Sequence, residues 1–133
     1  MPRVFTSRRQ KTGEIGETIA AKYLISHGYN VIERNYTKPW GEIDIVAIMD
    51  ETLYFIEVKT VSRERNASYE YKNYRPEENM NPYKVRKIYR TIEIYLSDRN
   101  VPEIMDWQLD LICVYLDPAK RQAKVKRIEN IIG

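Results

Sequence analysis

Three charged residues, Asp44, Glu57 and Lys59, lie inside the two most apolar stretches of the sequence. Asp44 belongs to Glu42–Met49, and Glu57 and Lys59 belong to Leu53–Thr60. Charged side chains are costly to bury unless they are paired or bind an ion. Two carboxylates and an ammonium group in one place would match a divalent metal ion together with a phosphate group.

The relative placement of these residues depends on how the two stretches pair. Both are expected to be β-strands, and only a few residues separate them, so a hairpin is the simplest connection. Glu57 and Lys59 are two positions apart and therefore share one face of their strand. A turn centred near Glu51 would pair residue 44 close to residue 58, and a shift of one residue decides whether Asp44 faces Glu57 or the opposite side.

In the favourable register the group suits phosphodiester hydrolysis. Asp44 and Glu57 could hold Mg²⁺ or Mn²⁺ through carboxylate oxygens, with water in the remaining positions. The metal would polarise the phosphate and acidify a bound water. Lys59 would orient that water or stabilise charge on the phosphoryl oxygens. The alternative is a structural ion pair on a solvated sheet face, because Glu-x-Lys is common on exposed strands.

Charged residues on two expected helices could join this group. Glu17 lies at the edge of an apolar helical stripe, where it could reach a cleft or simply be a surface acid that favours the helix dipole. Lys84 flanks the stripe of a second helix in the same way. Arg86, Lys87 and Arg90 are expected to point further outward, toward DNA phosphates or toward solvent alone.

Composition and charge limit the function classes. A chain of 133 residues is the size of one domain, and we expect a basic arm over residues 1–13 and a single domain over residues 14–133. The arm contains Arg8 and Arg9, residues 118–133 are also basic, and the middle of the chain is acidic. Basic ends around an acidic middle suit a polyanion at the rim and cations at the centre, although ordinary solubilising charge is the alternative.

Secretory and redox signals are missing from the sequence. No stretch is apolar enough to span a bilayer, and no apolar segment follows the basic N-terminus. The single cysteine, Cys113, lies in an apolar strand-like run and is expected to be a buried small hydrophobe. We therefore expect a soluble cytoplasmic protein without disulfides.

The elements that must position the charged group follow the order α-β-β-β-α-β-β. The first helix is expected over about Gly13 to His27, and the second begins at the N-cap Asn81 and Pro82. Residues 61–81 are expected to form a long, tyrosine-rich loop. The expected strands are Tyr29–Tyr36, Glu42–Met49, Leu53–Thr60, Trp107–Leu116 and Gln122–Ile128.

Several blocks of the sequence together resemble the uncharacterised protein family 0102, the YraN-like family, over roughly Gly13 to Ile128. The blocks are Gly16-Glu17, Tyr23-Leu24, Gly28-Tyr29, Arg34-Asn35-Tyr36, Gly41 to Ala47, Phe55 to Thr60, Pro82, Lys84, Tyr95-Leu96 and Asp110. That family is similar to archaeal Holliday junction resolvases and belongs to the PD-(D/E)xK nuclease superfamily.

The resemblance implies a restriction-endonuclease-like α/β fold, a three-layer core with a mixed sheet flanked by helices. It makes Asp44 and Glu57 the metal ligands, assisted by the backbone carbonyl of Val58, and it makes Lys59 the catalytic lysine. Glu17 becomes an accessory acid, and Lys84 becomes a basic residue that faces the cleft.

These expectations describe a Mg²⁺-dependent endonuclease acting on DNA, with branched or structured DNA as one substrate. A homodimer would match the two-fold symmetry of branched DNA. The alternatives are a nucleic-acid-binding module that has the nuclease fold without cutting and a partner-binding protein, because a fold does not fix a function.

Overall fold

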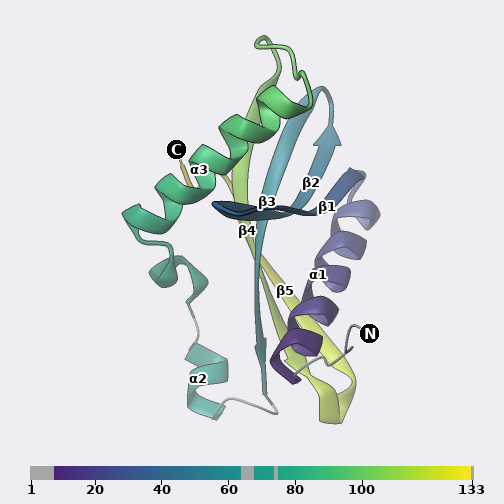
Figure 1. The fold of residues 1–133 in the computed structure, drawn as a ribbon. Coiled ribbons are helices and arrows are strands. Elements are labelled where there is room, and N and C mark those ends of the chain that lie inside the picture. Colours follow the sequence, from purple (N-terminus) through teal and green to yellow (C-terminus); the bar gives the residue numbers. More distant parts are fainter. Residues whose placement is uncertain (1–7, 64–67, 74, 133) are drawn as a thin grey trace, which may run out of the picture.

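A computed structural model describes residues 8–63, 68–73 and 75–132 of the chain. Two long helices and five strands carry the fold, joined by three short helical segments (Figure 1). The elements in chain order are α1 (Arg8–Ser26), β1 (Asn30–Lys38), β2 (Gly41–Met49), β3 (Thr52–Ser62), α2 (Ser68–Asn73), η1 (Pro76–Asn79), α3 (Pro82–Asp98), β4 (Asp106–Asp117), η2 (Pro118–Lys120) and β5 (Gln122–Ile128).

The strands form one mixed sheet in the order β1-β2-β3-β4-β5. Three of the four neighbouring pairs are antiparallel, and β3 and β4 are parallel. The parallel pair requires a crossover connection, which contains α3. The predicted α/β class, mixed sheet and element order α-β-β-β-α-β-β are confirmed, and the arrangement is consistent with the restriction-endonuclease-like fold.

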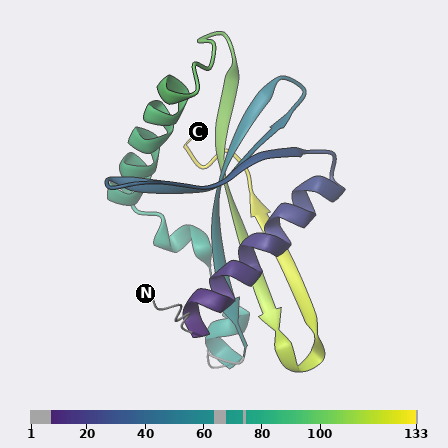
Figure 2. The same ribbon diagram turned by 45° about the vertical axis from the view of Figure 1, so that its right-hand side comes forward.

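Each face of the sheet carries one long helix, so the fold has three layers (Figures 1 and 2). On one face, Ala20 and Leu24 of α1 pack against Ile45, Ile56 and other buried residues of the strands. On the other face, Ile92 and Tyr95 of α3 pack against a second cluster of buried residues, which includes Tyr36, Ile43, Val46, Phe55 and Leu109. Strand β3 is the middle strand of the five and contributes residues to both clusters.

The start of α3 and the end of α1 lie where the sequence predicts them. Asn81 caps α3, because its side-chain oxygen accepts a hydrogen bond from the backbone N–H of Lys84 at 2.9 Å. Beyond the end of α1, Gly28 adopts a φ of +91°, a conformation that glycine accommodates without strain. The His27 ring lies 2.7 Å from the carbonyl oxygen of Tyr23, as expected for a residue at a helix C-terminus.

Two expectations about element boundaries were wrong. Helix α1 begins at Arg8, so the described part of the predicted basic arm is helical and Glu17 lies well inside the helix instead of near its first turn. The predicted loop over residues 61–81 begins within β3 and contains α2 and η1. Among the described residues, no helix is long and apolar enough to cross a membrane.

Candidate functional site

The hairpin of β2 and β3 places Asp44 opposite Glu57. The two turn residues, Asp50 and Glu51, both have positive φ values, of 50° and 64°, which is the backbone of a two-residue type I′ turn. Pairing runs from Met49 and Thr52 to Ile45 and Ile56. The next positions along both strands are Asp44 and Glu57, so the turn lies slightly earlier than expected and the favourable register is the one observed.

The strands part where these two acids lie. Beyond Ile45 and Ile56, β2 and β3 no longer pair with each other, while β2 remains paired with β1 as far as Gly41 and β3 with β4 as far as Ser62. Figure 2 shows the first two strands turning away from the other three. Asp44 and Glu57 therefore lie at the mouth of a fork in the sheet, where β2 and β3 no longer pair with each other.

A kink in β2 gives Asp44 an unusual position. Ile43 belongs to the cluster under α3 and Ile45 to the cluster under α1, although residues two apart on a regular strand share one face. On β1, Asn35 lies between the residues paired with Ile43 and Ile45 and has a left-handed backbone with φ of 54°. Asparagine tolerates this conformation better than most residues. Asp44 lies near Glu57 of β3 and Glu17 of α1.

Asp44 is nearly enclosed, with 8% of its surface exposed. Its Oδ2 atom accepts a hydrogen bond from the backbone N–H of Val58 at 2.7 Å. Burial, together with the negative charges of Glu57 and Glu17, raises the pKa of Asp44 to about 8, although the Val58 hydrogen bond opposes this rise. Burial and the neighbouring acids therefore favour the protonated form of this carboxyl.

Glu57 and Glu17 lie near the Asp44 carboxyl, and Lys59 pairs with Glu57. The Nζ atom of Lys59 lies 3.1 Å from Oε2 of Glu57, and both side chains are partly exposed. Partial burial and the nearby carboxylates of Glu42 and Glu57 raise the pKa of Glu17, while Arg34 lowers it. Three acids from α1, β2 and β3 therefore share one electrostatic environment.

The donor atoms of this site suit a hard divalent cation. In the described part of the chain, no group of three or more His, Cys, Asp or Glu side chains is placed to hold a metal ion. The available pair is Asp44 and Glu57, whose carboxylate oxygens are the ligands that Mg²⁺ prefers, alongside water and substrate phosphate. A nearby cation would stabilise the ionised form of Asp44, which burial and neighbouring acids now oppose.

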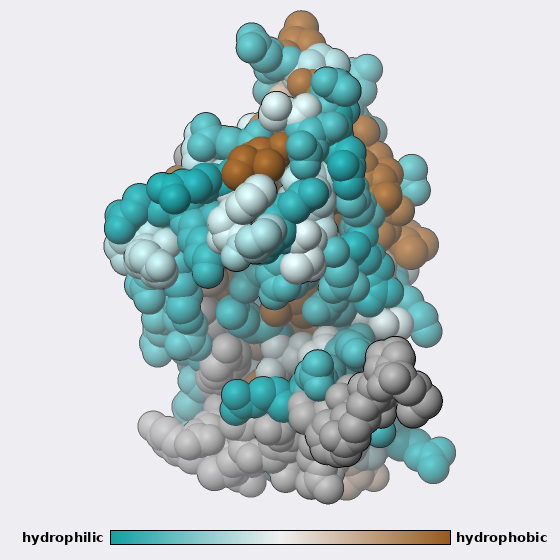
Figure 3. All heavy atoms as spheres, viewed as in Figure 1, coloured by the Kyte–Doolittle hydropathy of each residue, from teal (hydrophilic) through white to brown (hydrophobic). Residues whose placement is uncertain are grey.

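A cavity between the fork and α3 brings basic residues toward the acids. Its lining comes from β2, β3, the segment before α3, and α3 itself: Glu42, Glu57, Lys59, Met80, Lys84, Lys87, Ile88 and Thr91. Lys84 lines the cavity as expected, and Lys87 lines it too, although it was expected to point further outward. Arg86 and Arg90 are exposed and do not line it. Hydrophilic residues cover most of the face seen in Figure 3.

The two basic residues of the expected N-terminal arm lie on α1. Arg9 is exposed, and the side chain of Arg8 lies outside the described residues. Neither residue lines the cavity beside Glu57. The structure therefore brings Asp44, Glu57, Lys59, Glu17 and Lys84 to one region and leaves Arg9, Arg86 and Arg90 on the surface.

Two glycines allow the helices to approach the site. A Cβ atom at Gly16 of α1 would overlap the side chain of Thr60, next to Lys59 on β3. A Cβ atom at Gly41 of β2 would overlap the hydroxyl of Thr91 on α3. Close contact at these positions fixes Glu17 over one side of the fork and Lys87 and Lys84 over the other.

Two residues of the site were missed from the sequence. Glu42 lines the cavity and adds to the negative charge near Glu17. Arg34 donates a hydrogen bond to the Thr18 hydroxyl at 3.3 Å and opposes the rise in the pKa of Glu17. Glu42 could have been found from its position two residues before Asp44 on the same strand, whereas the proximity of Arg34 depends on the packing of α1.

Comparison with known sequences identifies relatives of this chain. Residues 16–114 match the model of the uncharacterised protein family UPF0102. A UPF0102 protein of Campylobacter fetus subsp. fetus is 39% identical over 116 residues, covering 87% of this chain and 88% of the relative. A UPF0102 protein of Campylobacter hominis is also 39% identical, covering 93% and 96%. A UPF0102 protein of Moorella thermoacetica is 37% identical, covering 96% and 98%. The chain therefore belongs to the uncharacterised protein family UPF0102.

Proposed function

We propose that this protein is a Mg²⁺-dependent endonuclease that hydrolyses phosphodiester bonds in DNA, with branched or structured DNA as its substrate. The observation that carries the proposal is the buried Asp44 carboxyl close to Glu57, at a fork of the sheet with Lys59 beside Glu57. A buried acid among other acids is costly unless a cation joins it. The matching ligand is a divalent metal together with a phosphate.

Each residue of the site has a chemical role in this proposal. Asp44 and Glu57 would hold Mg²⁺ or Mn²⁺, with the backbone carbonyl of Val58 as a further oxygen donor. When bound, the metal would supply positive charge that polarises the phosphate and lowers the pKa of water. Lys59 would orient the attacking water or stabilise the charged phosphoryl oxygens, and Glu17 would accept a hydrogen bond from water in the cleft.

The basic residues of α3 would position the DNA backbone. Lys84 and Lys87 line the cavity beside Glu57 and would bind a phosphate that enters it. Arg86 and Arg90 lie exposed on the same helix and would meet more distant phosphates. Arg8 and Arg9 would add contacts from α1. Such a protein would act in the cytoplasm, and a homodimer would suit the two-fold symmetry of branched DNA.

The test is a cleavage assay on linear, single-stranded and four-way-junction DNA with EDTA, Mg²⁺ or Mn²⁺. We expect metal-dependent cleavage that is lost in Asp44→Ala and Glu57→Gln, and reduced roughly 100-fold or more in Lys59→Met. Glu93→Gln is the matched control, because Glu93 is an exposed acid on α3. Cleavage that persists in Asp44→Ala and Glu57→Gln would refute the assignment.

The second candidate is a module that binds nucleic acid without cutting it. The observation that favours it is the ion pair between Lys59 and Glu57, at 3.1 Å, which satisfies both groups in the absence of any ligand. The same assay separates the two functions. Salt-dependent DNA binding without cleavage under any metal condition would support this candidate.

A further inference from the structure

A second part of the sheet surface lies on the same face as Glu57 and Lys59. Lys59 pairs with Cys113 of β4, and Cys113 pairs with Lys126 of β5. One step further along, Tyr115 pairs with Lys124. Paired residues of neighbouring strands point to the same side of a sheet, so these side chains lie on the same sheet face as the candidate active site, with the buried Cys113 between Lys59 and Lys126. Lys126 lies two strands from Lys59, roughly 10 Å away at the usual strand spacing.

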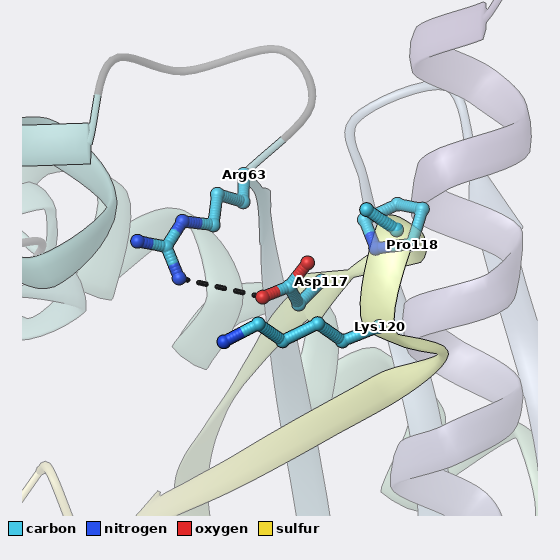
Figure 4. A pocket seen from close by; sticks show the side chains of 5 residues that line it. Arg63, Asp117, Pro118 and Lys120 are labelled. Atoms are coloured by element: carbon cyan, nitrogen blue, oxygen red, sulfur yellow. Dashed lines mark hydrogen bonds and ion pairs between the residues drawn. The ribbon is translucent and has the colours of Figure 1, made fainter.

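This surface is hollowed and basic. Three adjoining hollows follow it from the ends of β3 and β4 to the middle of β5, and they share lining residues with one another. Figure 4 shows the first hollow, which Arg63 and Lys120 flank. We call the surface the β4–β5 basic face and define it by its six basic lining residues: Arg63, Lys72, Arg75, Lys120, Lys124 and Lys126.

Acidic residues neutralise only part of this charge. Asp117 forms an ion pair with Arg63 at 3.3 Å (Figure 4), and Glu77 forms one with Lys126 at 3.8 Å. Lys120 and Lys124 are exposed, and no ion pair joins either of them to another described residue. The remaining positive charge favours a partner with a regular series of negative charges.

Two tyrosines lie among these basic residues. The rings of Tyr71 and Tyr115 meet edge to face, with centroids 5.9 Å apart, and the Arg63 guanidinium lies 5.4 Å from the Tyr71 ring centroid. Both tyrosines are half-buried and line the hollows. Aromatic rings beside a basic groove are the features that bind single strands, because unpaired bases expose faces that can stack. A duplex keeps those faces inside its own stack.

We propose that the β4–β5 basic face binds a single-stranded segment of DNA that continues from the site at Asp44 and Glu57. The inference rests on the proposed function for the identity of the polymer. The single-stranded DNA would leave the site on the side away from α3. Lys120 and Lys124 would bind its phosphates, and one of its bases would stack on Tyr71. A branched or frayed DNA would supply such a segment next to a duplex arm.

The test measures binding of a fluorescent oligothymidylate and of a hairpin duplex by polarisation, in EDTA, across a series of salt concentrations. Each of Lys120→Gln and Lys124→Gln should reduce the slope of log affinity against log salt by about 0.7 for the single strand. Lys22→Gln is the control, since Lys22 is exposed on α1, which covers the other face of the sheet. Tyr71→Leu should weaken single-strand binding roughly fivefold or more and leave duplex binding unchanged.

Two results would overturn the inference. The first is a salt slope in both lysine variants that equals the slope of Lys22→Gln, since the face would then make no phosphate contacts. The second is equal weakening of single strand and duplex by Tyr71→Leu, since stacking on an unpaired base would then be refuted.

Failure of this inference differs from failure of the proposed function. If the protein cleaves DNA in a metal-dependent way while Lys120→Gln and Lys124→Gln bind single strands normally, the inference fails and the nuclease assignment stands. If single-strand binding depends on these lysines but no metal supports cleavage, the nuclease assignment fails and the inference stands.

Discussion

The protonation of one carboxyl, that of Asp44, links the energetics of this fold to its proposed chemistry. Asp44 is nearly enclosed, accepts one backbone hydrogen bond, and lies close to Glu57. Lys59 forms its ion pair with Glu57. A divalent ion would satisfy both carboxylates at once, which is why we regard this pair as the centre of the site.

The first prediction concerns pH. The pKa of Asp44 is raised from an ordinary value of 3.8 to about 8 in the folded protein, so the folded state binds the proton more tightly than the unfolded state does. The stabilisation is therefore complete below about pH 4 and is lost as the pH rises toward about 8, with a limiting slope of about −1.4 kcal/mol per pH unit in the free energy of unfolding. Asp44→Asn should lack this contribution.

Denaturant unfolding of both proteins in EDTA, from about pH 5 to about pH 9, checks this prediction. The stability of Asp44→Asn relative to the wild type should rise across this range. A difference that stays constant with pH would show that Asp44 ionises normally.

The sequence predicted which residues form the site better than it predicted how those residues are arranged. Charges within apolar strands marked Asp44, Glu57 and Lys59, because burial of such groups needs a reason. The register remained open by one residue because the turn residues, Asp50 and Glu51, include no glycine to mark a type I′ turn. The kink at Asn35 and Asp44 was not predicted, because it depends on tertiary packing. Ile43 and Ile45 of β2 pack in different apolar clusters, one under each long helix.

At the scale of elements, the close approach of α1 to β3 positions Glu17. Gly16 lies against Thr60, and a side chain there would separate helix from strand. Glu17 follows directly, and Lys59 precedes Thr60, so the contact sets the distance between the helix acid and the sheet. Gly13, one turn earlier on the same helix, would place a Cβ atom in open space.

The second prediction compares these two glycines. Gly16→Ala should reduce the free energy of unfolding by about 1–3 kcal/mol, because the new methyl group overlaps Thr60. Gly13→Ala should increase it by about 0.5–1 kcal/mol, because alanine favours the helix and nothing obstructs it. Denaturant unfolding measures both. Equal effects of the two substitutions would contradict the close contact.

The third prediction concerns α3. Lys84 and Lys87 line the cavity beside Glu57, whereas Arg86 lies exposed on the same helix. If DNA is cleaved, Lys84→Gln and Lys87→Gln should lower cleavage at saturating DNA more than Arg86→Gln does, because an exposed arginine contributes to binding alone. Single-turnover cleavage rates provide the measurement. A larger loss in Arg86→Gln would place the substrate on the outer face of the helix.

At the scale of the whole molecule, the order of elements was predictable and the connecting segments were not. Apolar periodicity and capping residues marked the two long helices, and apolar runs bounded by turn residues marked the five strands. Residues Arg8 to Thr12 lack an apolar stripe, so the true start of α1 was missed. Helices α2 and η1 were missed because their sequences hold few aliphatic residues and many charges.

A buried ion pair joins β5 and the end of the chain to the centre of the sheet. Asp110 of β4 is fully buried, and Arg127 of β5 donates to its Oδ2 atom from two nitrogens, at 3.1 and 2.6 Å. The Asp110 carboxylate also accepts from the Gln108 side chain and from the backbone N–H of Asn130, both at 2.8 Å. Asp110 is therefore a structural residue.

The fourth prediction follows from this ion pair. Arg127→Met should lower the free energy of unfolding by about 3–5 kcal/mol, because it leaves the Asp110 charge buried without its partner. Asp110→Leu combined with Arg127→Met should recover part of that loss. Denaturant unfolding checks both variants. A loss below about 1 kcal/mol in Arg127→Met would show that water reaches the carboxylate.

The central claim is that Asp44 and Glu57 together form a divalent metal site. The most direct measurement is anomalous X-ray scattering from crystals of the protein grown with Mn²⁺, compared with crystals of Asp44→Asn grown in the same way. We expect an anomalous peak between the two carboxylates in the wild type and no peak in the variant. Crystals of the wild type without a peak there, at Mn²⁺ concentrations that saturate ordinary carboxylate sites, would contradict the account.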